Sequence, residues 1–277
     1  MPVSQQSSRL STKTAMSNPK PCLPPETLDS IIDFLRDKPW VLKACCLVSK
    51  SWIPHARKHL FANVKFRSSV DLEAWKRAFP DPEKSPAYHT RSLSVRCAES
   101  VTIVDAEGDG WIQTFSNVVR LELWNNAKIW QESKDSLVPF HNLSPVVKSL
   151  RVVSSNLSSS QIFNLVSSLP PLEDLSVVGR GIHTLDRNEV VSQPSISPPL
   201  TGTFYIRRWL KHVVRQLLDL PSGLNFREFT CEECLEEDLK WVTALVERCS
   251  DTLERVDIGC KIFGKSPPSS PFDRNRR

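Results

Sequence analysis

Glycine is scarce in this chain, and long apolar runs are missing. Only 8 of the 277 residues are glycine, and Gly108 and Gly110 stand among acidic residues with no Lys-Ser/Thr behind them. A Gly-rich loop that cradles phosphate is therefore not expected, and a dinucleotide-binding fingerprint is not expected either. No apolar run approaches the roughly 18 residues that a membrane-spanning helix needs. The sequence predicts a chain that does not cross a bilayer.

Motifs for catalysis and metal binding are equally sparse. The chain has no HExxH and no Gly-x-Ser-x-Gly pattern, and the nearby pair His55 and His59 would need a third ligand to hold a metal. Cys231 and Cys234 form a CxxC among acidic residues, which oppose thiolate formation. We expect both cysteines to be structural, with no cofactor, no metal and no catalytic residue. An enzyme or metal protein built around them is the alternative.

The first 22 residues are polar and contain no apolar stretch, so they do not resemble a secretory signal. A reducing compartment follows, and we expect the protein to be cytoplasmic, nuclear or both. In such a compartment the eight cysteines are expected to be buried thiols and not disulfides.

The net charge of +5 is unevenly distributed. Residues 1–22, 23–68 and 261–277 carry +3, +4 and +4, whereas residues 69–260 carry −6. A nucleic-acid-binding protein would have a basic stripe on its folded body, so no nucleic-acid partner is expected. Residues 261–277 are interpreted as a disordered basic tail, with a localisation or nucleic-acid contact of Arg274–Arg277 as the alternative.

Residues 22–66 have the pattern of three short helices, preceded by a disordered arm over residues 1–21. Pro25 suits a first helical position, and apolar residues from Leu28 to Leu35 recur at helical spacing. A break at 36–39 leads to a second helix, which is apolar nearly all round. A third helix, with Ser49 or Ser51 as its cap and Pro54 in its first turn, runs from Trp52 to Phe61. So many apolar residues on so small a body predict a partner surface, unless they pack on the following domain.

The sequence of this segment resembles the F-box family, as found in numerous proteins of mushroom-forming fungi. The matching residues are Leu23-Pro24, Glu26, Leu28, Ile31-Ile32, Leu35, Leu47-Val48 and Trp52. The resemblance covers the segment 22–66 and implies docking onto a Skp-type adaptor and, through it, onto a cullin. It implies that these residues contact the adaptor or support the contacts: Leu23, Pro24, Ile32, Leu35, Leu42, Val48 and Trp52.

A four-residue cell of alternating polar and apolar residues recurs through the body. Its first apolar position returns about every 27 residues, a spacing within the range of leucine-rich repeats. Helical stripes fall between several cells, at 157–169, 206–220 and 235–249, and a connection at 67–91 contains a further helix at 70–79. The seven positions are Leu93, Leu121, Leu150, Leu175, Phe204, Phe229 and Val256.

We therefore predict an α/β chain: a three-helix F-box-like module followed by an irregular leucine-rich-repeat-like solenoid over 92–260, with a parallel sheet on one face. Irregularity is expected because the Asn/Cys ladder of regular repeats is mostly missing, and residues 186–199 are interpreted as an inserted loop. A leucine-rich α/β domain with evenly spaced strands by chance is the alternative.

Alternation also predicts which side chains of the strands meet a target protein. The alternative is that the rings of Trp124 and Tyr205 tuck against neighbouring strands. The function expected is a non-catalytic substrate-recognition adaptor of a cullin-based ubiquitin ligase. A leucine-rich interaction scaffold unconnected with ubiquitin is the alternative. The predicted target-binding residues are Arg96, Glu122, Trp124, Arg151, Tyr205 and Arg207.

Overall fold

The computed structural model describes residues 24–97, 110–125, 140–141, 143–154, 159–169, 172–179, 200–208, 210–220 and 223–260. Leu23, the predicted terminal segments 1–21 and 261–277, and the predicted inserted loop 186–199 lie outside these residues. The chain divides into two units, one ending at Ala56 and one beginning at Arg57.

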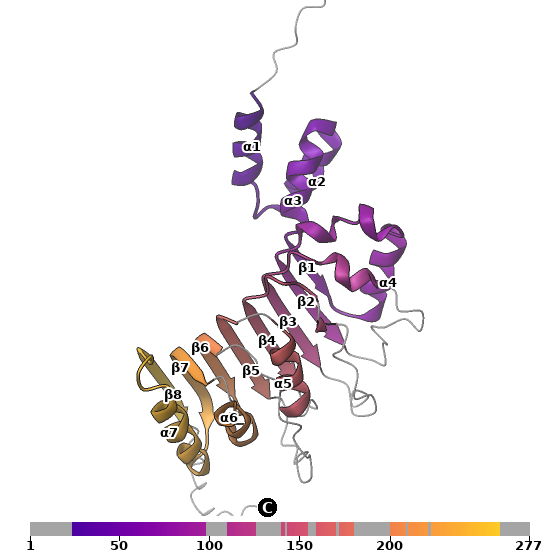
Figure 1. The fold of residues 1–277 in the computed structure, drawn as a ribbon. Coiled ribbons are helices and arrows are strands. Elements are labelled where there is room, and N and C mark those ends of the chain that lie inside the picture. The colour runs from indigo at the N-terminus through magenta and orange to yellow at the C-terminus, as the bar shows by residue number, and fades with distance from the viewer. Residues whose placement is uncertain are drawn as a thin grey trace, which may run out of the picture. The chain divides into compact units, whose positions relative to one another are not determined.

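The first unit is helical, and its helices form where the apolar stripes predict them. Helix α1 spans Pro25–Phe34, α2 spans Pro39–Val48, a 3-10 turn spans Lys50–Trp52, and α3 (Ile53–Leu60) begins in this unit (Figure 1). Both α1 and α2 start with proline, which needs no hydrogen-bond acceptor there.

A histidine connects the third helix of this unit to the first. His55 places Nε2 2.8 Å from Asp33 Oδ1 and Nδ1 3.5 Å from Asp29 Oδ1. The two aspartates are four residues apart on α1 and therefore share one side of that helix. This imidazole thus joins α3 to one side of α1.

In its described residues the second unit contains one sheet of eight parallel strands in sequential order from β1 to β8, so the predicted α/β class with a parallel sheet is confirmed. Figure 1 shows them side by side. The strands are β1 (Asn63–Phe66), β2 (Ser92–Cys97), β3 (Arg120–Asn125), β4 (Ser149–Ser154), β5 (Asp174–Gly179), β6 (Leu200–Arg207), β7 (Leu224–Cys234) and β8 (Arg255–Cys260).

The strand register matches the sequence pattern. The seven recurring apolar positions are all partners of one another across adjacent strands, from Leu93 of β2 to Val256 of β8. A second apolar row follows two residues later, beginning with Val95 and Leu123. Since parallel strands cannot be joined by a tight turn, each interval must carry the chain back across the sheet.

The sheet begins earlier than predicted. Residues 63–66 form β1 and pair with β2, although they fall in the range assigned to the helical module, 22–66. Their sequence, Asn63-Val64-Lys65-Phe66, has the same alternation as the other strands, and Val64 is the register partner of Leu93, one repeat spacing later. The repeat could therefore have identified this strand.

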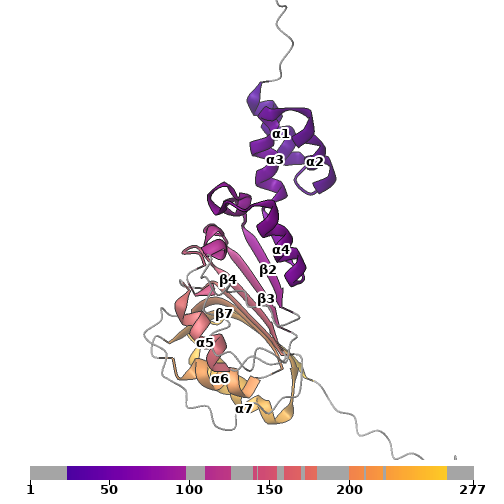
Figure 2. The ribbon, with the colours of Figure 1, turned by 90° about the vertical axis from the view of Figure 1, so that its right-hand side faces the viewer.

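Helices pack on one face of the sheet, and Figure 2 shows α5 (Ser159–Ser168), α6 (Leu210–Leu218) and α7 (Leu239–Arg248) together on that side. The apolar rows of the strands form one buried cluster with side chains of these helices and of α4 (Ser69–Ala78). Helices were predicted in all four of these intervals. At the β1 end the cluster is aromatic, because Trp111 of a 3-10 turn (Gly110–Thr114) and Phe115, which follows that turn, pack against Phe66.

A ladder of polar side chains connects successive turns of the chain. Each member donates a hydrogen bond to a carbonyl oxygen 26 to 29 residues earlier, with donor–acceptor distances from 2.7 to 3.3 Å. In each bond, a backbone carbonyl oxygen of one turn accepts a hydrogen bond from a side chain of the next turn. The ladder thus adds side-chain hydrogen bonds between turns to the pairing of the strands. The donors are Thr90, Asn117, Ser144, Thr201 and Thr252.

Candidate functional site

The first unit leaves most of its large apolar side chains in contact with solvent. Four apolar side chains in its described part are buried, Ile32, Leu42, Cys45 and Ala56, and two of these are small. Exposed apolar groups on this scale mark interaction sites in soluble proteins. The exposed residues and their exposed fractions are Ile31 41%, Phe34 81%, Trp40 74%, Leu47 89% and Val48 69%.

Helix geometry separates the buried from the exposed side of α2. Trp40, Leu47 and Val48 are spaced by seven and eight residues, so they share one side, whereas Leu42 and Cys45 face the core. The sequence predicts cover on both sides of this helix, because it is apolar nearly all round. The described residues cover one side only, which leaves the other side free for a partner.

The predicted adaptor-contacting residues fall into three groups. Ile32 and Leu42 are buried, so they support the unit from inside. Leu35 and Trp52 are half-buried, Pro24 and Val48 are exposed, and Leu23 lies outside the described residues. Four exposed residues are missing from the predicted set. Two of them, Trp40 and Leu47, lie on α2, whose apolar character on all sides indicated an exposed surface. The four are Ile31, Phe34, Trp40 and Leu47.

The second candidate surface is the face of the sheet opposite the helices. Two rows of side chains cross all eight strands on this face, and every member is exposed or half-buried. The first row is Asn63, Ser92, Arg120, Ser149, Asp174, Thr203, Glu228 and Arg255; the second is Lys65, Ser94, Glu122, Arg151, Ser176, Tyr205, Thr230 and Asp257. We call these sixteen residues the open face.

A third row borders the open face at the carboxyl ends of the strands. It begins with Arg96 and Trp124 and ends with Arg207, Glu232 and Gly259. Between them lie Val153 and Val178, which are 1% and 8% exposed. The middle of this third row is therefore covered, whereas its two ends are accessible.

The structure brings the predicted target-binding residues together as pairs. The guanidinium carbon of Arg96 lies 4.8 Å from the ring centroid of Trp124, a cation–π arrangement. Arg151 Nε lies 3.4 Å from Glu122 Oε1 on the neighbouring strand. Tyr205 and Arg207 lie farther along the sheet, on β6.

Arg207 belongs to a compact charged cluster at the end of β6 and β7. Its Nε donates to Glu233 Oε1 at 2.8 Å, and Arg208 Nε donates to Oε2 of the same carboxylate at 2.5 Å. These hydrogen bonds lower the pKa of Glu233 to about 2. Arg208 and Glu233 both have left-handed backbone angles, with φ of 61° and 57°, and Glu233 occupies a bulge in β7. The ion pairs hold two backbone conformations that these residue types rarely adopt.

The hydroxyl of Tyr205 provides a pH prediction. Burial, together with a hydrogen bond to Glu232, raises the pKa of Tyr205 from 10.0 to about 12. The neutral phenol therefore stabilises the fold below about pH 10, and this contribution is lost as the pH rises toward 12. The chain has two tyrosines, so the variant Tyr88→Phe leaves Tyr205 alone.

In a spectrophotometric titration of Tyr88→Phe, the folded protein should form phenolate about two pH units above the same chain in urea. Adding Glu232→Gln should bring the folded midpoint closer to that of the unfolded chain. Equal midpoints for folded and unfolded Tyr88→Phe would contradict the assignment.

The CxxC cysteines face the covered side of the sheet. Cys231 and Cys234 are buried, and Cys234 is the register partner of the exposed Cys260 on β8. Burial and the neighbouring Cys234 raise the pKa of Cys231 to about 12, and burial also raises the pKa of Cys234. Both groups are thus held as thiols, whereas redox and metal chemistry need the thiolate. This environment favours the structural interpretation.

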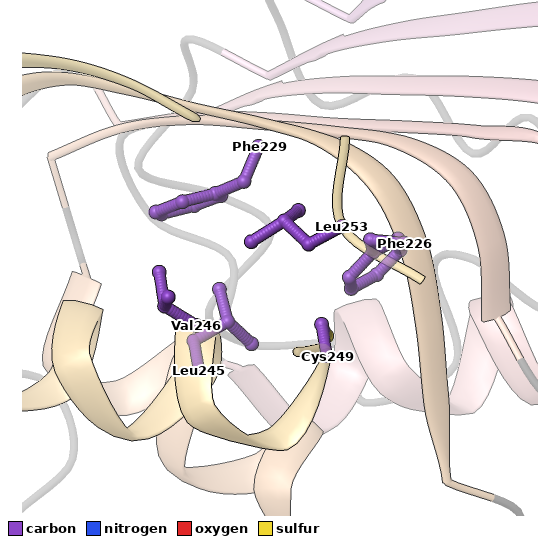
Figure 3. Close-up of a pocket in the computed structure, with 6 residues that line it drawn as sticks. All are labelled: Phe226, Phe229, Leu245, Val246, Cys249 and Leu253. Atoms are coloured by element: carbon purple, nitrogen blue, oxygen red, sulfur yellow. The ribbon is translucent and has the colours of Figure 1, made fainter. Parts of the chain in front are cut away.

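A narrow apolar hollow, with no room for a water molecule, lies between β7 and α7 (Figure 3). Phe226 and Phe229 approach it from the strand, and Leu245, Val246 and Cys249 approach it from the helix, with Leu253 at its side. None of the six residues carries a carboxylate, imidazole or amide side chain that would orient a polar ligand. We interpret the hollow as a gap in the packing.

Comparison with known proteins found no family model, no curated protein and no solved structure that matches this chain. The described helices are all too short or too polar to cross a membrane.

Proposed function

We propose that this chain is a substrate-recognition adaptor of a cullin-RING ubiquitin ligase of the SCF type. In this proposal the N-terminal helices form an F-box-like module that docks onto a Skp-type adaptor. The body is an irregular leucine-rich-repeat-like solenoid, and its open face holds a target protein. No residue of this chain performs bond chemistry, since the ligase acts by raising the effective concentration of the target.

The observation that carries the proposal is the exposed apolar surface of α1 and α2. The exposed fractions of Phe34, Trp40 and Leu47 are 81%, 74% and 89%, although the three lie on consecutive short helices. In its described residues the first unit buries four apolar side chains and exposes five, two of them aromatic, so it gains stability when a partner covers the exposed ones. The F-box resemblance falls on this segment and names a partner of the required kind.

The strand arrangement supports the solenoid part of the proposal. Each strand pairs with the one before it and the one after it in sequence, and equivalent positions of successive cells are register partners. The polar ladder from Thr90 to Thr252 joins successive turns at a similar spacing. Both features are typical of stacked repeats, in which each unit contacts its neighbours.

The experiment is a binding assay with purified full-length chain and a recombinant Skp-type adaptor. The double variant Leu47→Glu/Val48→Glu places two charges on the exposed side of α2, where burial against a partner would cost a large desolvation energy. Its affinity for the adaptor should fall by at least about 100-fold, since central interface residues contribute about 2 kcal/mol or more each.

The matched control is Val70→Glu/Val146→Glu, which makes the same kind of change at two exposed valines of the second unit. It should bind the adaptor like the natural chain. Circular dichroism should show that both double variants retain their helices. If the Leu47/Val48 variant binds as tightly as the control, or if the natural chain does not bind at all, the interaction scaffold becomes the better hypothesis.

A further inference from the structure

The open face is a polar surface, unlike the apolar surface of the first unit. Seven of its sixteen positions carry a hydroxyl group, eight are charged, and the remaining one is Asn63. Serine and threonine are short, so a bound segment can approach the backbone of the sheet closely and form hydrogen bonds with the hydroxyl groups. The hydroxyl residues are Ser92, Ser94, Ser149, Ser176, Thr203, Tyr205 and Thr230.

The charges on this face separate by sign along the sheet. Strands β1 to β4 carry Lys65, Arg120 and Arg151 against one acid, Glu122, and Arg96 adds a further cation at the border. Strands β5 to β8 carry an acidic excess, because three carboxylates there meet one arginine on the open face. Those residues are Asp174, Glu228, Asp257 and Arg255.

The length of the face sets the size of its ligand. Neighbouring strands lie about 4.8 Å apart, so eight strands span about 34 Å. An extended polypeptide rises about 3.3 Å per residue, so about ten residues cross the whole face. A basic half and an acidic half within that distance match a ligand whose own charges are separated in the opposite order.

From this arrangement we propose that the open face binds an extended, polar segment of the target protein, about ten residues long, with an acidic end over β1 to β4 and a basic end over β5 to β8. This inference rests on the proposed function, because it names the chemistry of the target. A polynucleotide fits less well, because its phosphates would meet Asp174, Glu228 and Asp257 on the second half.

The test uses the full-length chain and two labelled peptides of about twelve residues. Both have the same composition and zero net charge; one has its glutamates at one end and its lysines at the other, and the second alternates them. In fluorescence anisotropy the segregated peptide should bind at least about tenfold more tightly, because only it satisfies both halves at once. Its affinity should fall as salt is added.

The key variant is Lys65→Glu/Arg120→Glu, which reverses two cations of the first half. It should weaken binding of the segregated peptide by about tenfold or more, since two attractions become repulsions. The matched control, Arg215→Glu/Arg248→Glu, makes the same kind of reversal on exposed positions of α6 and α7, on the helical side of the sheet. It should leave the affinity unchanged.

Several results would overturn the inference: equal binding of the two peptides, no binding of either, an equal loss in the helix-side control, or tighter binding of a single-stranded oligonucleotide of similar length. Each leaves the proposed function testable by itself, because adaptor binding depends on Leu47 and Val48 in the first unit. Adaptor binding without peptide binding would reject the target chemistry alone. Peptide binding without adaptor binding would reject the ligase proposal alone.

Discussion

Replacing Gly202 with alanine is expected to destabilise the sheet unit by about 3 kcal/mol or more. Gly202 lies in β6 at a register shift beside Thr203, and its φ of +78° is in the left-handed region. A Cβ at this position would lie 1.8 Å from the carbonyl oxygen of Glu173. That oxygen also accepts the hydrogen bond of the Thr203 backbone N–H at 2.7 Å, so strand β6 must move away from β5.

Gly223 provides the matched control for this variant. It has the same φ of +78°, but a Cβ there would meet no atom within 4 Å. Gly223→Ala should therefore cost only the backbone term, about 1 kcal/mol. Urea denaturation of the two variants, followed by circular dichroism, separates the clash from the backbone strain. Equal losses in the two variants would show that β6 accommodates the methyl group.

The sheet was predictable because most side chains on one face of its strands are buried and most on the other face are accessible. Half-burial makes apolar and polar residues alternate, and this alternation marks each strand from Leu93 to Val256 together with its register. The first strand follows the same rule but is shorter, and it directly follows a helical segment. Pattern alone therefore places its four residues, Asn63 to Phe66, in the helical module, although the spacing to Leu93 fits the repeat.

The polar ladder could not be read from residue types. Serine and threonine are common in any loop, and nothing in their immediate sequence marks a hydrogen bond to a carbonyl about one repeat away. Thr90 is fully buried and donates to the Phe61 carbonyl oxygen at 3.0 Å, whereas Thr243 lies on an exposed part of α7 and bonds within its own helix. Which threonine joins two turns depends on the stacking of the turns.

The sequence also did not identify which side of the first unit's helices is exposed. Helix α2 has apolar residues on all sides, so periodicity does not distinguish Leu42 from Leu47. The packing of the short helices decides that Leu42 is fully buried and Leu47 is 89% exposed. The resemblance to the F-box pattern selected Leu42 and Val48 by position, and one of these supports the unit from inside while the other lies on its surface.

The two leucines of α2 are expected to respond very differently to alanine. Leu42→Ala removes a fully buried side chain from a core of four, and such a deletion typically costs about 2 to 5 kcal/mol, so about 3 kcal/mol is expected here. A unit of this size has about that much stability to lose. Leu47→Ala removes the same atoms from the surface and should change stability by less than about 0.5 kcal/mol.

Hydrogen exchange measured by mass spectrometry checks this prediction, because it reports on residues 24–56 separately from the sheet unit. In Leu42→Ala the amides of α1 and α2 should exchange rapidly while the sheet keeps its protection. In Leu47→Ala both units should exchange as in the natural chain. Protection of α2 that survives Leu42→Ala would show that this leucine is not the centre of the core.

Adding the Skp-type adaptor then distinguishes loss of fold from loss of contact. A partner that binds only the folded unit stabilises it by about 2.7 kcal/mol at a concentration about 100 times its dissociation constant. Saturating adaptor should therefore restore most of the protection in Leu42→Ala, since the contacting residues Leu47 and Val48 are still present. In Leu47→Ala the unit is folded from the start, and the adaptor should add less protection than it adds to the natural chain, because part of the contact surface is missing.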